Sequence, residues 1–158
     1  RGAMANAIES MLKRENVQIW EGADSWEEAV VIACTPLIDN GFVAPRYAEG
    51  IIDNANEFGP YFVICPDLAL LHARPEQGAL KTQLSVTVMR EPVFFKPEGP
   101  GVRVLVTLAA TDANSHLEVM KELAVMFSNP DTIEKIATAK TADEVYDDFV
   151  ADAEKAGE

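Results

Sequence analysis

Short apolar runs bounded by turn-forming residues constrain the fold of this chain more than any other feature. Such runs are typical of short strands, and amphipathic stretches with helix caps lie between and after them. The runs cover residues 17–20, 61–64, 83–89 and 102–108. Strands this apolar indicate a sheet covered by helices on both faces. We therefore predict an α/β fold, a three-layer α/β/α sandwich with a mixed, mostly buried central sheet of about four or five strands.

Capping residues mark where the helices begin. Ser25 followed by Glu28 is a capping box, and Gly41 is expected just after the end of that helix. Pro36 falls inside the same span and is expected to kink or split it. Asn114 or Ser115 is expected to cap a later helix. Helices are predicted over about 5–15, 26–40, 46–58, 116–127, 130–139 and 142–153, and a structured loop over 65–78.

Composition restricts the classes of function. Residues 1–4 are interpreted as a cloning remnant and residues 5–158 as a single domain, 48% of the chain being apolar. No apolar run approaches the ~18 residues that cross a membrane, so we expect no direct membrane insertion. The net charge of −13 disfavours nucleic acid and anionic lipid as partners. Two cysteines make neither a disulfide framework nor a four-ligand zinc site, and the N-terminus lacks a signal-peptide apolar core, so a cytoplasmic protein is expected.

Each of the two histidines is a candidate site residue. His72 lies on a segment stiffened by Pro66 and Pro75 that follows a strand, and Arg74 comes two residues later. An imidazole can attack phosphorus, and a guanidinium can hold phosphoryl oxygens in a fork. The alternative is a loop histidine that only bonds a backbone carbonyl.

His116 is expected in the first turn of a helix, where N–H groups and the helix dipole attract anions. It would add a hydrogen-bond donor there, unless it only takes part in the cap of its own helix. Because both histidines follow a strand-to-loop transition, they could meet at one edge of the sheet.

Other residues offer competing site hypotheses. Cys65 could be a nucleophile with His72 as its base, whereas Cys34 is expected in the core. A metal site would need His72 and His116 plus carboxylates, but no ligand pair has the close helical spacing of common zinc motifs. No metal and no cofactor are therefore expected.

Three stretches resemble one family. Residues 58–64 (Phe-Gly-Pro-Tyr-Phe-Val-Ile) followed by the 66–78 segment with its His-Ala-Arg-Pro sequence resemble the ascorbate-type enzyme IIA of the bacterial phosphoenolpyruvate-dependent sugar phosphotransferase system, within the fructose/mannitol class. The stretch 110–114 (Ala-Thr-Asp-Ala-Asn) with His116 is similar to the second family motif. Residues 44–47 (Ala-Pro-Arg-Tyr) resemble a third, weaker motif. The likeness runs from about Leu12 to Phe149.

The resemblance implies a phosphoryl carrier with an α/β/α fold. It implies that His72 is phosphorylated by the phosphocarrier protein HPr. The group then passes to a cysteine of the cognate IIB subunit, and so to the membrane IIC transporter, in the uptake and phosphorylation of L-ascorbate or a related sugar. His116 matches the family's second histidine, which supports the phosphoryl group without carrying it. Arg74 stands where arginine is usual in the subfamily.

Some positions depart from the family pattern. Leu71 stands where proline often precedes the histidine, and Asp67 stands where glycine is common. A carboxylate at Asp67 would be unfavourable near a phosphoryl group unless it points away. Residues 51–54 lack the arginine that mannitol-type domains carry in the preceding helix.

The site must also be open to protein partners. Leu68, Leu70 and Leu71 are therefore candidates either for an exposed docking patch or for the core under the loop. Two other functions stay open: a IIA-like regulatory module whose phosphorylation state controls a partner protein, and a metal-dependent hydrolase.

Overall fold

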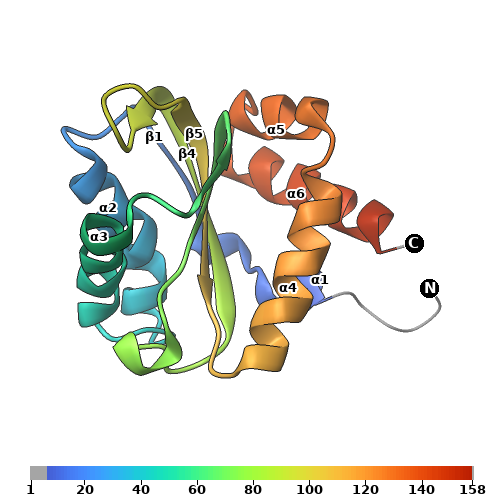
Figure 1. The fold of residues 1–158 in the computed structure, drawn as a ribbon. Coiled ribbons are helices and arrows are strands. Elements are labelled where there is room, and N and C mark those ends of the chain that lie inside the picture. The colour runs from blue at the N-terminus through green and yellow to red at the C-terminus, as the bar shows by residue number, and fades with distance from the viewer. Residues whose placement is uncertain (1–6, 158) are drawn as a thin grey trace.

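The computed structural model describes residues 7–157. It shows a five-stranded mixed sheet between two layers of helices, which confirms the predicted three-layer α/β/α sandwich (Figure 1). The expected cloning remnant and the first two residues of the first predicted helix lie outside the described residues. None of the described helices is both long and apolar enough to cross a membrane.

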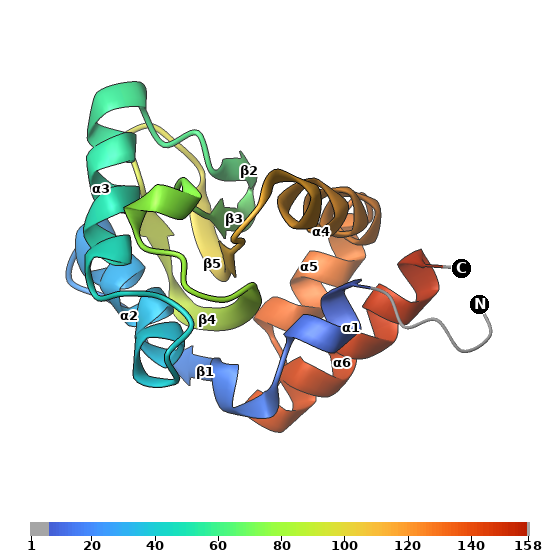
Figure 2. The same ribbon diagram turned by 90° about the horizontal axis from the view of Figure 1, so that it is seen from below.

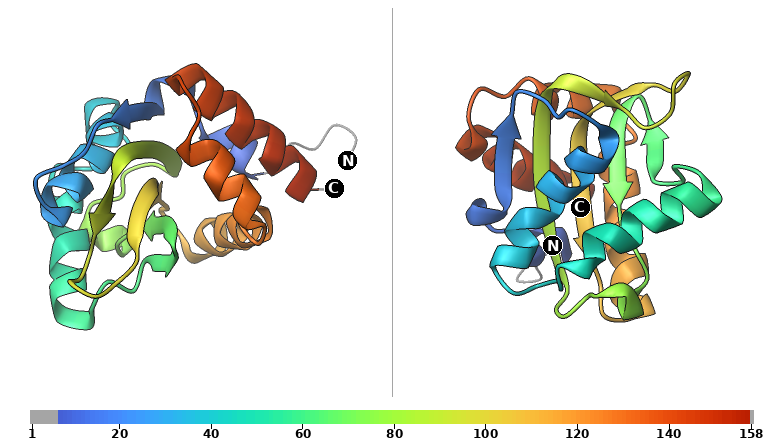
Figure 3. Two further views of the ribbon diagram at one scale, coloured as in Figure 1. Left: turned by 90° about the horizontal axis from the view of Figure 1, so that it is seen from above. Right: turned by 90° about the vertical axis from the view of Figure 1, so that its left-hand side faces the viewer.

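The sheet has the strand order β1-β4-β5-β3-β2. The strands are β1 Val17–Trp20, β2 Val63–Cys65, β3 Asp67–Leu71, β4 Gln83–Phe94 and β5 Gly101–Ala109. β1 runs parallel to β4 and β3 parallel to β5, whereas the β4–β5 and β2–β3 pairs are antiparallel. The right-hand view of Figure 3 looks at the sheet from the side of α2 and α3, with β1 and β2 at its two edges.

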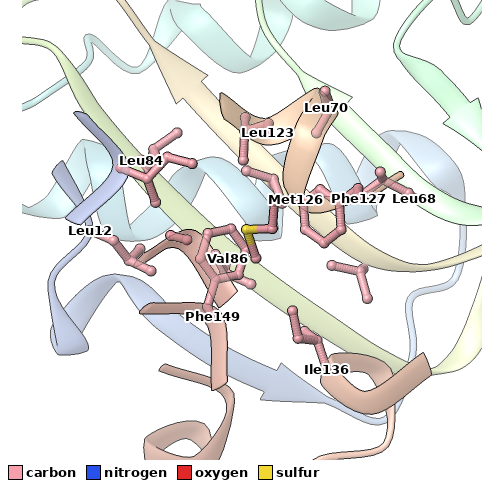
Figure 4. Packing of buried hydrophobic residues seen from close by; sticks show 14 of the residues in the cluster. Leu12, Leu68, Leu70, Leu84, Val86, Leu123, Met126, Phe127, Ile136 and Phe149 are labelled. Carbon is pink, nitrogen blue, oxygen red and sulfur yellow. The ribbon is translucent and has the colours of Figure 1, made fainter. Parts of the chain in front are cut away.

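Helices cover both faces of this sheet. The helices are α1 Ala7–Met11, α2 Trp26–Asp39, α3 Arg46–Phe58, α4 Ala113–Met126, α5 Pro130–Ala137 and α6 Ala142–Ala156, with 3-10 turns η1 Arg14–Asn16 and η2 Pro75–Gln77. Helices α2 and α3 lie on one face, and α1, α4, α5 and α6 on the other (Figures 1 and 2). Each face has its own apolar core. Figure 4 shows the core on the side of α1, α4, α5 and α6, where Phe149 of α6 and Leu123 of α4 pack against Val86 of β4.

The predicted helix boundaries rest on caps that the structure confirms. The hydroxyls of Ser25 and Thr141 accept from the N–H groups of Glu28 and Glu144, both at 3.1 Å. Gly41 follows α2 with a φ of 80°, a left-handed conformation that glycine adopts without strain. Helix α2 is continuous past Pro36, so of the two effects expected of this proline, a kink or a split, the split is wrong.

The region around His72 differs most from the prediction. Residues 67–71 form β3, which pairs with both β5 and β2, instead of belonging to a loop. The strand predicted over 61–64 is instead formed by Val63–Cys65, and it lies at the sheet edge, where Ile64 is 53% exposed. Strand β4 continues to Phe94 instead of ending at Met89.

Strands β3 and β5 place the site. They are parallel neighbours, with Leu71 opposite Thr107, so their carboxyl ends reach the same edge of the sheet. His72 directly follows β3, and a short turn after β5 leads into α4, which carries His116. The fold thus brings together two segments that are 44 positions apart in the sequence.

Candidate functional site

A pocket of about 450 Å³ lies where β3 and β5 end. Its lining includes His72, Arg74, Asp112 and His116, together with Asn54 and Tyr61 from α3 and the turn that follows it. In Figure 1, η2 and the start of α4 lie at the lower end of the sheet, on its two sides, and this end faces the viewer in Figure 2. The structure thus places all three site residues predicted from the sequence around one cavity.

One ring nitrogen of His72 is held by its own strand. Nδ1 lies 2.7 Å from the carbonyl oxygen of Leu70, an acceptor only, so Nδ1 carries the proton and donates it. The lone pair therefore resides on Nε2. Burial lowers the pKa of His72 below its ordinary value of 6.5, and His116 lowers it further against the opposing effect of the Leu70 carbonyl. His72 is thus a neutral imidazole at pH 7, with Nε2 available as a nucleophile.

Tyr61 fixes the backbone and ring of His72. Its hydroxyl donates to the carbonyl oxygen of His72 over 2.6 Å. The two rings meet edge to face, with centroids 5.2 Å apart. The resulting restraint limits rotation of the imidazole that the Leu70 hydrogen bond already orients.

His116 lies beside His72. Their ring centroids are 5.2 Å apart and the ring planes are inclined at 63°. This confirms that the two histidines converge at one end of the sheet, close enough for both rings to contact one small anion. Both side chains are partly exposed, so a group arriving from solvent can reach them.

The cap of α4 differs from the prediction. The N-cap is Asp112, whose carboxylate accepts from the N–H of Ser115 at 2.8 Å and from its hydroxyl at 3.1 Å. These hydrogen bonds lower the pKa of Asp112, so the carboxylate is ionised at neutral pH. The start of α4 therefore already carries an anion. The Asp112 carboxylate takes the N–H of Ser115, one of the N–H groups expected to bind an external anion. The imidazole of His116 remains as a hydrogen-bond donor from α4.

Arg74 supplies a cation at the rim of the pocket. Its Nε donates to Glu76 over 3.1 Å, and both side chains are more than half exposed. A pair this exposed contributes little to stability, so the guanidinium can turn from Glu76 toward an anion at low cost.

An amide pair that sequence reasoning missed braces the segment after His72. Asn54 of α3 and Gln77 of η2 exchange two hydrogen bonds, 2.9 and 3.1 Å long. The same Gln77 oxygen accepts from the backbone N–H of Arg74 at 2.8 Å. Asn54 is 6% exposed. No sequence signal marked Asn54 or Gln77 for this supporting part, whereas Tyr61 stands in the Gly-Pro-Tyr motif.

The leucines near His72 do not form a docking patch. Leu68, Leu70 and Leu71 are at most 5% exposed and belong to the two cores. The docking-patch alternative is wrong because β3 is an inner strand with both faces covered. The large exposed apolar side chains at the pocket are instead Phe58 and Tyr61, 63% and 39% exposed.

Cys65 and Asp67 lie at the far end of β3. Cys65 pairs with Leu68, four residues before His72, which is about 13 Å along a strand. The nucleophile–base pair of Cys65 and His72 is therefore wrong, and burial raises the pKa of the Cys65 thiol. Asp67 is the first residue of β3, five positions before His72, so its carboxylate is remote from the pocket. Arg103 holds this carboxylate through two hydrogen bonds, each 2.9 Å long.

Cys34 is buried on α2, as expected, and burial raises the pKa of its thiol to about 12. Among residues 7–157, no three histidine, cysteine, aspartate or glutamate side chains gather in a way that could hold a metal ion. The chemistry that the pocket offers is that of one neutral nucleophilic imidazole beside a second imidazole and a movable guanidinium. Such a set suits an electrophile that carries negative charge, as a phosphoryl group does.

Comparison with known proteins gives a consistent result. Residues 10–151 match the family model of the phosphoenolpyruvate-dependent sugar phosphotransferase system, EIIA 2. The chain is 37% identical over 141 residues to the ascorbate-specific PTS system EIIA component of Salmonella choleraesuis strain SC-B67, a match that covers 88% of this chain and 92% of the relative.

Solved structures share the fold. The mannitol-specific cryptic phosphotransferase enzyme IIA CmtB from Escherichia coli has a TM-score of 0.85 at 28% identity, covering 92% of this chain and 99% of that protein. The mannitol enzyme IIA of E. coli, in a complex with phosphorylated enzyme IIB, has a TM-score of 0.74 at 28% identity, covering 89% and 96%.

Proposed function

Because this chain belongs to the EIIA 2 family of the phosphoenolpyruvate-dependent sugar phosphotransferase system, we propose that His72 is the residue that carries its phosphoryl group. The protein is a phosphotransferase of the sugar-transport system. In the proposed cycle, His72 accepts the group from phospho-HPr in the cytoplasm and passes it to a cysteine of a cognate IIB subunit. The observation that carries the proposal is the Nδ1–Leu70 hydrogen bond, which leaves Nε2 of His72 nucleophilic beside His116.

Both steps can proceed without moving a proton on His72. In the first, the Nε2 lone pair attacks phosphorus, an N–P bond forms, and the N–P bond of the donor histidine breaks. The ring then holds a phosphoryl group on Nε2 and a proton on Nδ1, and its positive charge is stabilised by the Leu70 carbonyl. In the second step a thiolate attacks phosphorus and the N–P bond breaks. The leaving group is neutral imidazole, with its lone pair back on Nε2.

Charge in the transition state falls on the phosphoryl oxygens. Arg74 and His116 line the same pocket and are the groups proposed to stabilise these oxygens. Arg74 contributes by leaving Glu76, and His116 contributes a hydrogen-bond donor. The ionised Asp112 at the pocket rim opposes them and favours release of the group to the next acceptor.

The names of the relatives support a proposal for the substrate class. A 37% identical relative is named as the ascorbate-specific component, so the transported molecule proposed for this system is L-ascorbate or a related sugar. Since a mannitol enzyme IIA of the same fold forms a complex with phosphorylated IIB, a IIB subunit is the proposed acceptor here. Through IIB the group reaches the sugar carried by the membrane IIC transporter.

The proposal is tested by incubating the chain with phosphoenolpyruvate, enzyme I and HPr, followed by intact-protein mass spectrometry. One phosphoryl group per chain is expected, labile in acid and stable in base. His72→Ala should take up none, and His116→Ala should still take up one. Uptake of one acid-labile group by His72→Ala would overturn the assignment.

A further inference from the structure

Tyr47, in the first turn of α3, is the largest of the fully buried side chains and is 1% exposed. Its hydroxyl donates to the carbonyl oxygen of Leu108 over 2.7 Å. The hydroxyl oxygen of Tyr47 in turn accepts from the backbone N–H of Ala73 at 3.0 Å. Ala73 follows His72, and Leu108 lies in the last part of β5, the strand that leads to His116. One hydroxyl therefore links the two segments that carry the histidines.

The Tyr47 hydroxyl lies where the β3–β5 ladder ends. With Leu71 opposite Thr107, the next residues along the two parallel strands are His72 and Leu108. A continued parallel ladder can pair the Ala73 N–H directly with the Leu108 carbonyl. Here two hydrogen bonds in series replace that single bond. The β3–β5 ladder ends at Leu71 and Thr107, and beyond it the two segments are joined through the Tyr47 hydroxyl.

The segment that carries Tyr47 holds the loop after His72 at further points. The N–H of Ala44 donates to the Gly78 carbonyl over 2.8 Å, and Arg46 donates to the Glu76 carbonyl over 2.9 Å. Gly78 has a φ of 132° and lies so close to Tyr47 that an added Cβ would stand 3.4 Å from the Tyr47 Cβ. Residues 44–47 thus hold residues 73–78 in place through several contacts. This supporting part gives the Ala-Pro-Arg-Tyr stretch singled out in the sequence a structural reason.

We propose that Tyr47 is a positioning residue for phosphoryl transfer, whose hydroxyl sets the spacing between the His72 segment and the β5 end that leads to His116. This inference rests on the function proposed for His72. The side chain is buried, so it touches neither protein partner and acts through the backbone of Leu108 and of Ala73, whose carbonyl oxygen also lies 3.4 Å from the hydroxyl. Burial raises the pKa of Tyr47 well above its usual range, so the hydroxyl keeps its proton, and hence both hydrogen bonds, at every pH at which the protein works.

The test compares Tyr47→Phe with Ser85→Ala. Both changes remove one buried hydroxyl, since Ser85 donates to the Ala33 carbonyl from β4, a strand that does not pair with β3. Single-turnover phosphorylation by phospho-HPr is measured over a range of donor concentrations. We expect Tyr47→Phe to lower the maximal rate constant by about 10- to 100-fold at an unchanged half-saturating concentration, because misplacement by about 1 Å can cost 10²-fold. Ser85→Ala should keep both values.

A rescue variant separates positioning from stability. Replacing Tyr47 by 4-aminophenylalanine keeps a group that can donate and accept at the same place, and should return the rate to within a few fold of the unmodified chain. An unmodified rate in Tyr47→Phe would overturn the proposal. The proposal would also be overturned if Ser85→Ala lost as much rate as Tyr47→Phe, with the loss in each variant proportional to the decrease in its melting temperature.

A second readout does not depend on phosphoryl transfer. In the unmodified chain the Ala73 amide should exchange with solvent as slowly as core amides, although it lies beyond β3. Fast exchange would contradict the hydrogen bond from the Ala73 N–H to the Tyr47 hydroxyl, even if no variant folds. In Tyr47→Phe the imidazole resonances of both His72 and His116 should shift, and in Ser85→Ala they should not. Absence of phosphorylation in the unmodified chain would instead contradict the proposed function of His72 and leave these two measurements valid.

Discussion

Replacing His116 by alanine should leave His72 able to accept a phosphoryl group but slow its transfer to IIB. The rings are 5.2 Å apart, so His116 can reach an oxygen of a group bonded to Nε2 of His72. Loss of one preorganised donor in a dry site costs about 10²- to 10³-fold in rate. Here both histidines are partly exposed, and water can replace part of the lost bond. We therefore expect the lower end, about 10²-fold, or about 2.7 kcal/mol in the barrier.

The assay is rapid-quench transfer from the isolated phospho-protein to IIB. His116→Gln keeps a donor and should recover part of the loss. Glu118→Ala changes an exposed residue of the same helix and controls for disturbance of α4, so it should transfer at the unmodified rate. Full-speed transfer by His116→Ala would refute the reasoning and leave His116 without a part in the chemistry.

Three further predictions concern the surroundings of the pocket. Because burial lowers the pKa of His72, the rate of phosphorylation should rise with pH with an apparent pKa below 6.5, as measured by a pH–rate profile; a midpoint at or above 6.5 would contradict the neutral-nucleophile mechanism. Arg74→Ala should slow transfer by about 10-fold or more while Glu76→Gln leaves urea stability within ~0.5 kcal/mol, since their ion pair is exposed. Arg103→Ala should cost about 1–3 kcal/mol in urea unfolding, because it removes two hydrogen bonds to the partly buried carboxylate of Asp67, yet leave phosphorylation unchanged, because that pair lies at the far end of β3.

Local signals located the main helices and indicated the convergence of the two histidines, although they missed the true cap of α4 and the continuity of α2 past Pro36. Caps such as Ser25 and Thr141 act within three residues, so the sequence alone locates them. That His72 and His116 could meet followed from a single rule, that segments leaving strand ends gather at one edge of an α/β sheet.

The strand before His72 could not be predicted in the same way. Leu68 and Leu70 face one core while Ala69 and Leu71 face the other, so the stretch lacks the alternation that marks a half-buried strand. Pro66 just before it also suggested a loop. Its inner neighbour, β5, lies more than 30 positions away in the sequence, so no local pattern shows that pairing.

The supporting contacts of the site were also beyond sequence reasoning. The acceptor that orients His72 is a backbone carbonyl, that of Leu70, and every residue has one. The hydroxyl of Tyr47 acts on two other backbone groups, and only the folded sheet shows which ones. Backbone partners of this kind cannot be identified from the types of the side chains.

The most direct test of the account is to find which nitrogen of which histidine carries the phosphoryl group. The chain is labelled with ¹⁵N-histidine and phosphorylated with phosphoenolpyruvate, enzyme I and HPr. Two-dimensional ¹H–¹⁵N spectra of the imidazole rings then report the state of each nitrogen. The account predicts phosphorus on Nε2 of His72 and a retained proton on Nδ1, bonded to the Leu70 carbonyl. Phosphorus on Nδ1 of His72, or on either nitrogen of His116, would contradict it.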